Sequence, residues 1–178
     1  MKNTALGFRS KENSVKERHK LNMKILVFSD AHGQTRGMEQ AICAHERDTD
    51  AILFLGDGMR EAELLLQRFP QIMHTAVPGN NDIGYGGVQD CILDLQGVRT
   101  LCTHGHKYGV KGGRGRLYQA ALEKEVQLVL FGHTHVAEEC IMDGIRFFNP
   151  GSIGRGIERT YGVLYIENGK IVSGFGKI

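Results

Sequence analysis

The stretch KILVFSDAH, residues 24–32, passes from apolar to polar side chains within a few positions. A short apolar run of this kind predicts a buried strand. The run ends at Ser29, so Asp30 and His32 follow directly beyond the carboxyl end of the strand. Two side chains able to bind a metal therefore stand next to the first predicted strand.

The same arrangement recurs downstream in alternation with helical patterns. Apolar runs predict strands at 51–55 and 72–77, and apolar spacing predicts helices at 35–47 and 60–69. We expect Thr35 to cap the first helix. Strand–helix–strand–helix–strand order predicts parallel neighbours joined by right-handed crossovers.

The second half of the chain carries turn signals that join pairs of strand-like runs. Asp143-Gly144 and Asn168-Gly169 are strong signals for two-residue hairpins, and Gln96-Gly97 is a weaker one. A helix at 114–125 and a buried strand at 127–131 lie between the first hairpin and the other two. These patterns predict one α/β domain, parallel early in the chain and antiparallel late.

Polar clusters follow five of the predicted strands. They are Asp30-Ala31-His32, Gly56-Asp57, Gly79-Asn80-Asn81-Asp82, His104-Gly105-His106 and Gly132-His133-Thr134-His135. Loops beyond the carboxyl ends of parallel strands form the ligand crevice of α/β sheets, so we expect these clusters to converge.

The ligand types in these clusters indicate which ions could bind there. Asp, Asn and His without thiolate suit Mn, Fe, Co, Ni or Zn better than a pure calcium site. Seven candidates suffice for two metals with positions left open for water, and a central carboxylate such as Asp57 can bridge both ions. Two metals about 3.5–4 Å apart generate a hydroxide and stabilise an in-line phosphoryl displacement.

Three of the five clusters also have a structural explanation of their own. Asp-x-His can be a cap or turn, Gly-Asp-Gly a turn, and Gly-Asn-Asn-Asp a left-handed turn. His-Gly-His and His-Thr-His resist this explanation, since they hold four of the eight histidines of the chain. The occurrence of all five clusters in this order favours a metal-binding site.

The order Asp-x-His, Gly-Asp, Gly-Asn-x-Asp, His-Gly-His, Gly-His-Thr-His and Asn-Pro-Gly-Ser resembles the calcineurin-like metallophosphoesterase superfamily. More narrowly, it is similar to the small bacterial and archaeal phosphodiesterases and to the retromer subunit that shares their fold. The match runs from Met23 to the C-terminus. The resemblance implies a single-domain, metallophosphoesterase-type sandwich of two mixed β-sheets flanked by helices.

The resemblance also implies a role for each position. One metal would be held by Asp30, His32 and His135, a second by Asn80, His104 and His133, and Asp57 would bridge them. Catalysis would involve Asp57, Asn80 and His106. His106 would act by orienting the metal ligands or by contacting the substrate, not as a metal ligand itself. The segment 149–152 would support the site. The cofactors would be two divalent ions, Mn first, with Ni, Co, Fe or Zn as alternatives.

One departure from the family pattern concerns Asn81. Many members have histidine there, the proposed general acid for the leaving alkoxide, whereas an amide cannot donate a proton usefully. We therefore expect hydrolysis of phosphodiesters or activated aryl phosphates. The alternatives are a phosphomonoesterase, or a metal-binding interaction scaffold like the retromer subunit, which would have an exposed apolar patch.

Two glycine-rich segments allow more than one interpretation. Lys111, Arg114 and Arg116 follow His-Gly-His and could reach a substrate phosphate, but a solvated loop and helix start is preferred. The segment 84–87 predicts a mobile loop in which Tyr85 could cover the site.

Composition and charge limit the partners and the location. With 178 residues and 41% hydrophobic content, the chain fits one domain and shows no membrane-length apolar run. Six basic and two acidic residues give 1–22 a charge of +4, which leaves −2 for 23–178 out of the total of +2.

These charges predict a basic, frayed extension at 1–22 and a metallophosphoesterase domain at 23–178. They do not favour nucleic acid, so the expected partner is a small phosphate ester, with no membrane; a homo-oligomer is left open. The four scattered cysteines predict buried free thiols and a cytoplasmic location.

Overall fold

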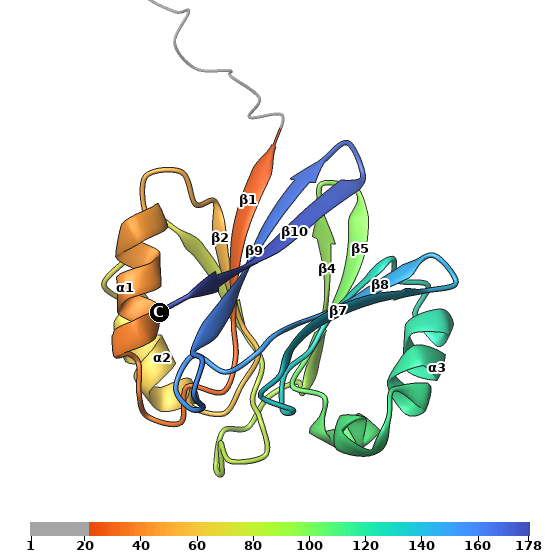
Figure 1. Ribbon diagram of the computed structural model, residues 1–178, viewed down its shortest axis with the longest axis horizontal. Coiled ribbons are helices and arrows are strands. Elements are labelled where there is room, and N and C mark those ends of the chain that lie inside the picture. The colour runs from red at the N-terminus through yellow and green to blue at the C-terminus, as the bar shows by residue number, and fades with distance from the viewer. Residues whose placement is uncertain (1–21) are drawn as a thin grey trace, which may run out of the picture.

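A computed structural model describes residues 22–178, so the predicted N-terminal extension lies outside the described residues but for its last position. Two five-stranded sheets face each other, with strand orders β10-β9-β1-β2-β3 and β4-β5-β6-β8-β7. Figure 1 shows α1 and α2 on the outer face of the first sheet and α3 on that of the second. The predicted single-domain sandwich of two mixed sheets flanked by helices is confirmed.

The first sheet is built around β1, which is buried on both faces. Leu26 and Phe28 pack against the helix layer, whereas Ile25 and Val27 point into the layer between the sheets. Its strands are β1 (Met23–Phe28), β2 (Ala51–Phe54), β3 (Met73–Ala76), β9 (Thr160–Glu167) and β10 (Lys170–Lys177). The pairs β1–β2 and β2–β3 are parallel, as the strand–helix alternation predicted.

Two helices cover this sheet, α1 (Arg36–His45) and α2 (Met59–Leu66). Both bury one apolar face, as their spacing predicts. The predicted capping role of Thr35 is wrong, because that residue has helical backbone angles and its side chain makes no capping hydrogen bond.

The second sheet holds the remaining strands and packs on α3 (Gly115–Glu123). They are β4 (Asp90–Leu95), β5 (Val98–Thr103), β6 (Leu128–Leu130), β7 (Ala137–Met142) and β8 (Ile145–Pro150). The antiparallel prediction for this half is wrong for β6, which is parallel to both β5 and β8. The reason is the crossover through α3, which returns the chain to the same end of the sheet before β6 begins.

The three predicted hairpin turns are confirmed. Both central residues of each turn have positive φ: 50° and 83° at Gln96-Gly97, 46° and 81° at Asp143-Gly144, and 49° and 76° at Asn168-Gly169. Positive φ at both positions is the turn geometry that matches the twist of a two-residue hairpin. These turns fix the registers β4–β5, β7–β8 and β9–β10.

The cysteines are free but not all buried. Only Cys102 is buried; Cys43 is exposed, and Cys91 and Cys140 are half-buried. The prediction of four buried thiols is therefore wrong, because Cys91 and Cys140 lie on the edge strands β4 and β7. Among residues 22–178, no helix combines the length and apolar character needed to cross a membrane.

Candidate metal centre

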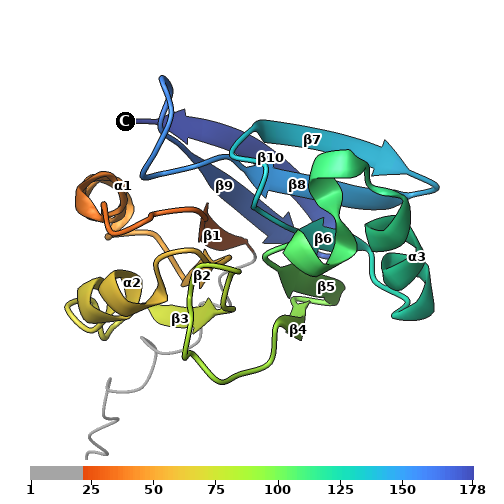
Figure 2. The same ribbon diagram turned by 90° about the horizontal axis from the view of Figure 1, so that it is seen from below.

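Six of the predicted metal ligands gather in two adjacent groups. One group is Asp30, His32 and His135, and the other is Asp57, His104 and His133; within each, the donor atoms lie within 4.8 Å of one another. The residues come from the loops after β1, β2, β5 and β6, which end at one edge of the sandwich. Figure 2 shows these loops together on the side facing the viewer.

Asp30 is fully buried, and its two carboxylate oxygens differ in their surroundings. Oδ2 accepts hydrogen bonds from the Ser29 hydroxyl at 2.7 Å and the His133 amide at 3.0 Å. Oδ1 is buried with no hydrogen-bond donor among the described residues, 3.1 Å from Nε2 of His135 and 3.8 Å from Nε2 of His32. A buried carboxylate oxygen without a donor is costly unless a cation compensates it, so the donor set fits a bound metal.

Asp57 lies between the two groups. Its Oδ2 is 3.5 Å from Nε2 of His104 and 3.8 Å from Nε2 of His32. Asn81 holds the carboxylate through its backbone amide, 2.8 Å from Oδ1, and its side-chain amide, 2.5 Å from Oδ2. Burial raises the pKa of Asp57, but the hydrogen bonds from His104 and Asn81 outweigh it and hold that pKa well below its usual range. An ionised carboxylate here suits a shared ligand.

The tautomer of His104 is fixed by its buried surroundings. Its Nδ1–H donates to the Leu55 carbonyl at 2.7 Å, which leaves Nε2 directed at Asp57 and at Nδ1 of His133, 3.1 Å away. A hydrogen bond from one ring nitrogen to a backbone carbonyl orients an imidazole so that its other nitrogen can bind a metal.

The two histidines of this pair differ in pKa. Burial lowers the pKa of His104, but the hydrogen bond to Asp57 and the nearby carboxylates raise it overall. Burial, with the positive charges of His104 and Lys111, lowers the pKa of His133 to about 4.

His32 and His135 form a matching pair, with their Nε2 atoms 3.2 Å apart. Burial and the Arg155 charge lower the pKa of His32. Imidazole nitrogens this close must share a proton or a cation, since two lone pairs would repel each other. Both histidine pairs, like the Asp30 carboxylate, are therefore suited to binding a metal ion.

The backbone of the site is unusual. Five of the candidate ligands have positive φ, namely Asp30, His32, Asp57, His133 and His135. Glycines permit close approach beside them: a Cβ on Gly132 would lie 1.9 Å from Oγ of Ser29, and one on Gly79 would lie 2.2 Å from Oδ1 of Asp57. Side chains rarely adopt this conformation unless the surroundings enforce it, and such strain clusters at functional sites.

The other two predicted site residues are placed differently. Asn80 is exposed, and its neighbour Asn81 is the asparagine that contacts Asp57. His106 is half-buried at the edge of the cluster, with its ring centroid 5.4 Å from that of His104 and 6.1 Å from that of His133. Burial and the His104 charge lower the pKa of His106.

The segment 149–152 supports the loops of the site. The Asn149 side-chain amide donates to the Gly132 carbonyl at 3.1 Å and to Thr134 Oγ1 at 2.9 Å. The Ser152 hydroxyl donates to the Asp30 carbonyl at 2.8 Å. These contacts tie the loop after β6 and the loop after β1 to β8.

Asp82 is a site residue that the sequence interpretation missed. Its Oδ2 accepts the amides of Asp57 and Gly79, both at 2.8 Å. Its Oδ1 accepts those of Gly58 at 2.8 Å and Met59 at 2.9 Å, at the start of α2. Asp82 thus joins the loop after β3 to the loop that carries Asp57. The last position of Gly-Asn-x-Asp was the available signal for it.

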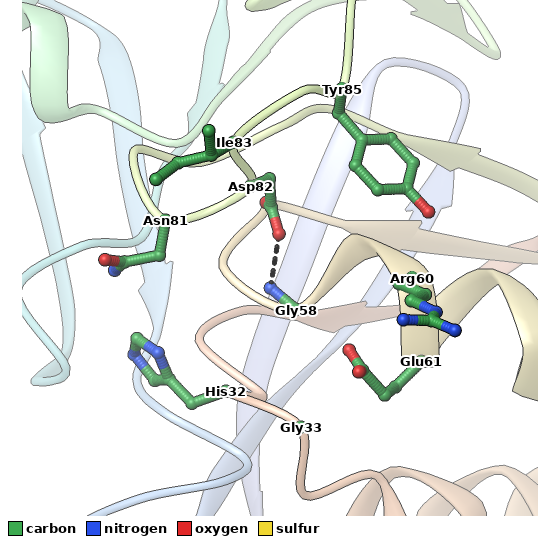
Figure 3. Close-up of a pocket in the computed structure, with 9 residues that line it drawn as sticks. All are labelled: His32, Gly33, Gly58, Arg60, Glu61, Asn81, Asp82, Ile83 and Tyr85. Atoms are coloured by element: carbon green, nitrogen blue, oxygen red, sulfur yellow. Dashed lines mark hydrogen bonds between the residues drawn. The ribbon is translucent and has the colours of Figure 1, made fainter.

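A hollow of about 280 Å³ opens beside the first group, lined by His32, Arg60, Asn81, Ile83 and Tyr85 among others. Figure 3 shows His32 and Asn81 at one end of it and Tyr85 with Arg60 at the other. The Tyr85 hydroxyl donates to Glu63 at 3.1 Å. Tyr85 therefore forms a wall of the hollow beside the site.

Comparisons with known proteins agree with this architecture. Residues 23–169 match the model of the calcineurin-like phosphoesterase superfamily domain. The chain is 31% identical over 150 residues to the probable metallophosphoesterase YsnB of Bacillus subtilis, covering 82% of this chain and 86% of the relative. A predicted phosphoesterase from Streptococcus pneumoniae aligns with a TM-score of 0.75 and 28% identity over 88% of this chain and 90% of its own.

More distant structures share the fold alone. One is an archaeal phosphodiesterase, with TM-score 0.65, 20% identity and coverage of 86% and 99%. Another is Vps29 from Entamoeba histolytica complexed with zinc, with TM-score 0.66, 19% identity and coverage of 87% and 99%. The matched domain and the B. subtilis relative show that this chain belongs to the calcineurin-like phosphoesterase superfamily.

Proposed function

We propose that this protein is a metal-dependent phosphodiesterase that hydrolyses P–O bonds at a two-metal centre. The observation that carries the proposal is the position of the Asp57 carboxylate, which faces histidines of both ligand groups within 3.8 Å. A single carboxylate between two ligand groups is the arrangement that two ions sharing one ligand require.

In this proposal each residue group holds one ion. The first ion would be held by Asp30, His32 and His135. The second ion would be held by Asn80, His104 and His133, with Asp57 as a ligand shared by both ions. When bound, two divalent metals activate water as a nucleophile and stabilise the charge that develops on the phosphoryl oxygens. The exposed Asn80 would turn inward to complete the second group.

The chain's own residues then shape the reaction. Asn81 fixes the orientation of the Asp57 carboxylate through two hydrogen bonds. His106 lies at the edge of the ligand cluster, where it can contact a substrate oxygen. No histidine occupies position 81 to protonate the leaving group, so the reaction depends on a leaving group that departs without help. This dependence favours diesters and activated aryl esters over alkyl monoesters.

Two other functions remain candidates on specific grounds. A phosphomonoesterase would use the same ligands. An interaction scaffold of the same fold is suggested by the exposed apolar side chain of Ile83, which lines the hollow beside the site. We favour the enzyme, because every predicted ligand position holds a side chain that can bind a metal. Mn is the proposed metal, with Ni, Co, Fe and Zn as alternatives for this oxygen and nitrogen donor set.

A metal analysis combined with an activity panel tests the proposal. Purified protein is loaded with Mn²⁺, Ni²⁺ or Zn²⁺ and assayed on an aryl diester, an aryl monoester, an alkyl monoester, a cyclic nucleotide and nucleic acid. We expect about two ions per chain and the highest kcat/KM on the aryl diester. Faster cleavage of alkyl monoesters would contradict the diester assignment. Two bound ions without turnover of any substrate would favour the scaffold.

A further inference from the structure

A second hollow lies beside the loops that carry the candidate metal centre. It measures about 620 Å³ and is lined by the turn before α3, the start of α3 and the loop after β6, including Val110, Lys111, Arg114, Thr134, Val136 and Glu138. We call it the Lys111 hollow. Two of its lining residues place it beside the ligand loops: Thr134 stands between His133 and His135 in the chain, and the Val110 side chain packs against Gly105, where an added Cβ would lie 3.1 Å from it.

The two hollows flank the centre. They share no lining residue: the smaller one lies beside α2 and the Lys111 hollow beside α3. Figures 1 and 2 both show α2 and α3 on opposite flanks of the sandwich, with the strand-end loops between them. A phosphodiester has one alcohol on each side of its phosphorus. With the phosphate at the metal centre, one alcohol can enter each hollow.

The charge in the Lys111 hollow is not balanced. Arg114 is paired with Glu138 across the hollow, which neutralises both side chains. Lys111 is exposed and forms no ion pair with any acidic residue of the described chain. Lys111 lines the hollow together with Thr134, the residue between His133 and His135 in the chain. One uncompensated ammonium group therefore faces the space next to the candidate centre.

Local structure holds Lys111 in place. It lies in the 3₁₀ turn η2 (Val110–Gly112), between Gly109 with φ 65° and Gly113 with φ 140°. Its neighbour Val110 is only 6% exposed and packs in the core beneath α3. The packing of Val110 therefore fixes the backbone of the turn that carries Lys111. An anchored backbone lowers the entropy cost of binding an anion at this side chain.

From this geometry we propose that the Lys111 hollow binds a second phosphate group, carried by one alcohol of the scissile phosphodiester. The substrate class is thus a small phosphodiester with a further phosphate on one arm. Lysine is an effective point-charge partner for phosphate, and a hollow of this size falls in the range of small-molecule sites. This inference rests on the proposed diesterase function.

Matched substrates and variants test the subsite. The Mn²⁺-loaded protein is assayed on the 4-nitrophenyl ester of thymidine 3′-phosphate, with and without a 5′-phosphate. We expect the 5′-phosphate to raise kcat/KM about 10-fold in the wild type, as for one charge-assisted contact. Lys111→Met should abolish this preference without changing the rate on the ester that lacks the 5′-phosphate. Lys124→Met, at the opposite end of α3, is the matched control and should keep the preference.

Binding provides a readout that does not depend on turnover. Calorimetry should show thymidine 3′,5′-bisphosphate binding about 10-fold more tightly than thymidine 3′-monophosphate, with the difference lost in Lys111→Met. The subsite is overturned if the two ligands bind equally tightly, or if Lys111→Met keeps the wild-type preference for the 5′-phosphate. This holds even if both esters are hydrolysed. If neither ester is hydrolysed, the proposed diesterase function is overturned. The calorimetric comparison alone then decides whether the subsite exists.

An oligonucleotide distinguishes the source of the second phosphate. Single-stranded oligothymidylate without terminal phosphates presents only internal diesters. We expect it to be cleaved at least 10-fold more slowly than the 5′-phosphorylated ester. Faster cleavage that depends on Lys111 would assign the hollow to a nucleic-acid strand and overturn the small-molecule assignment.

Discussion

At the residue scale, the ligands themselves adopt backbone conformations that side chains normally avoid. Asp30, His32 and Asp57 have φ of 56°, 45° and 62°, and His133 and His135 have 70° and 62°. Each such residue costs on the order of 1–3 kcal/mol unless its surroundings enforce the conformation. At Asp30 and Asp57 the hydrogen bonds described above supply that enforcement.

Asp57→Asn tests the central position of this carboxylate. The amide preserves the shape but removes the negative charge that two cations would share, an effect worth several kcal/mol in the transition state. We therefore expect kcat to fall by about 10³-fold, with an unchanged circular dichroism spectrum. Asp94→Asn, on the exposed edge of β4, is a control that should keep full activity. Full activity of Asp57→Asn would rule out a bridging role.

Asn81→His tests the dependence on the leaving group. A histidine at this position would supply the general acid that the chain lacks, which is worth about 10²–10⁴ in rate. We expect kcat for alkyl phosphate esters to rise by about 10²-fold while kcat for aryl esters changes little. The ratio of the two rates is measured with Mn²⁺ bound. Asn81→Gln, which keeps an amide, is the control, and an equal rise there would contradict the explanation.

Much of the site was predictable from single residues, because Asp and His directly after buried strands have little freedom in position. Six of the seven predicted ligands do come together. The contacts of Asn81 and Asp82 were not predictable, since they depend on the path of the loop after β3. The pattern Gly-Asn-Asn-Asp contains two adjacent asparagines, and spacing alone does not determine which one faces Asp57.

At the element scale, α2 is capped by a side chain from another part of the chain. Its N-cap residue, Gly58, has no side chain, and Asp82 accepts the first two amides instead. The same carboxylate holds the backbone of Asp57. The start of α2 and a proposed metal ligand therefore depend on one residue.

Asp82→Ala should consequently weaken both stability and metal binding. Loss of a cap costs about 0.5–2 kcal/mol, and unsatisfied buried amides cost about 1–3 kcal/mol more. We expect the free energy of unfolding to fall by about 2–4 kcal/mol and Mn²⁺ affinity to fall about 10-fold or more. Denaturant unfolding and metal titration measure the two effects. Asp94→Ala, which removes a single exposed turn hydrogen bond, is the control. Unchanged metal affinity in Asp82→Ala would limit Asp82 to a structural role.

Local sequence determined most elements but not all pairings. The turns at Asp143-Gly144 and Asn168-Gly169 were predictable because their residues favour positive φ, and the apolar strand β1 because it is buried on both faces. The parallel position of β6 between β5 and β8 was not, since it depends on long-range packing beneath α3. Thr35 failed as a cap because its backbone continues the helix.

At the scale of the whole molecule, we propose that residues 23–178 form the catalytic unit. The basic charge of the chain belongs to residues 1–22, and every ligand of the proposed centre lies beyond them. A chain that begins at Met23 should therefore keep the kcat/KM of the full chain on an aryl diester within about twofold. A loss of more than 10-fold, with the thermal midpoint unchanged, would show that the N-terminal residues take part in catalysis.

Metal binding should stabilise the whole fold, because the proposed ligands come from five loops, which follow strands of both sheets. Without an ion, the buried Oδ1 of Asp30 has no donor among the described residues, and close imidazole pairs face each other. A ligand present at 100 times its Kd adds about 2.7 kcal/mol. For a chain of this size we expect Mn²⁺ to raise Tm by about 5–10 °C.

Scanning calorimetry with Mn²⁺ and after chelation measures this shift, and two comparisons make it specific. Asp30→Asn should lose most of the rise, because the amide removes the anionic oxygen that faces His32 and His135. Mg²⁺ should raise Tm less than Mn²⁺ does, since histidine nitrogens suit Mn²⁺ better than Mg²⁺. An equal rise in Asp30→Asn would place the stabilising ion elsewhere. No rise with any divalent ion would mean that the two ligand groups do not hold metal, and the two-metal function would fall with them.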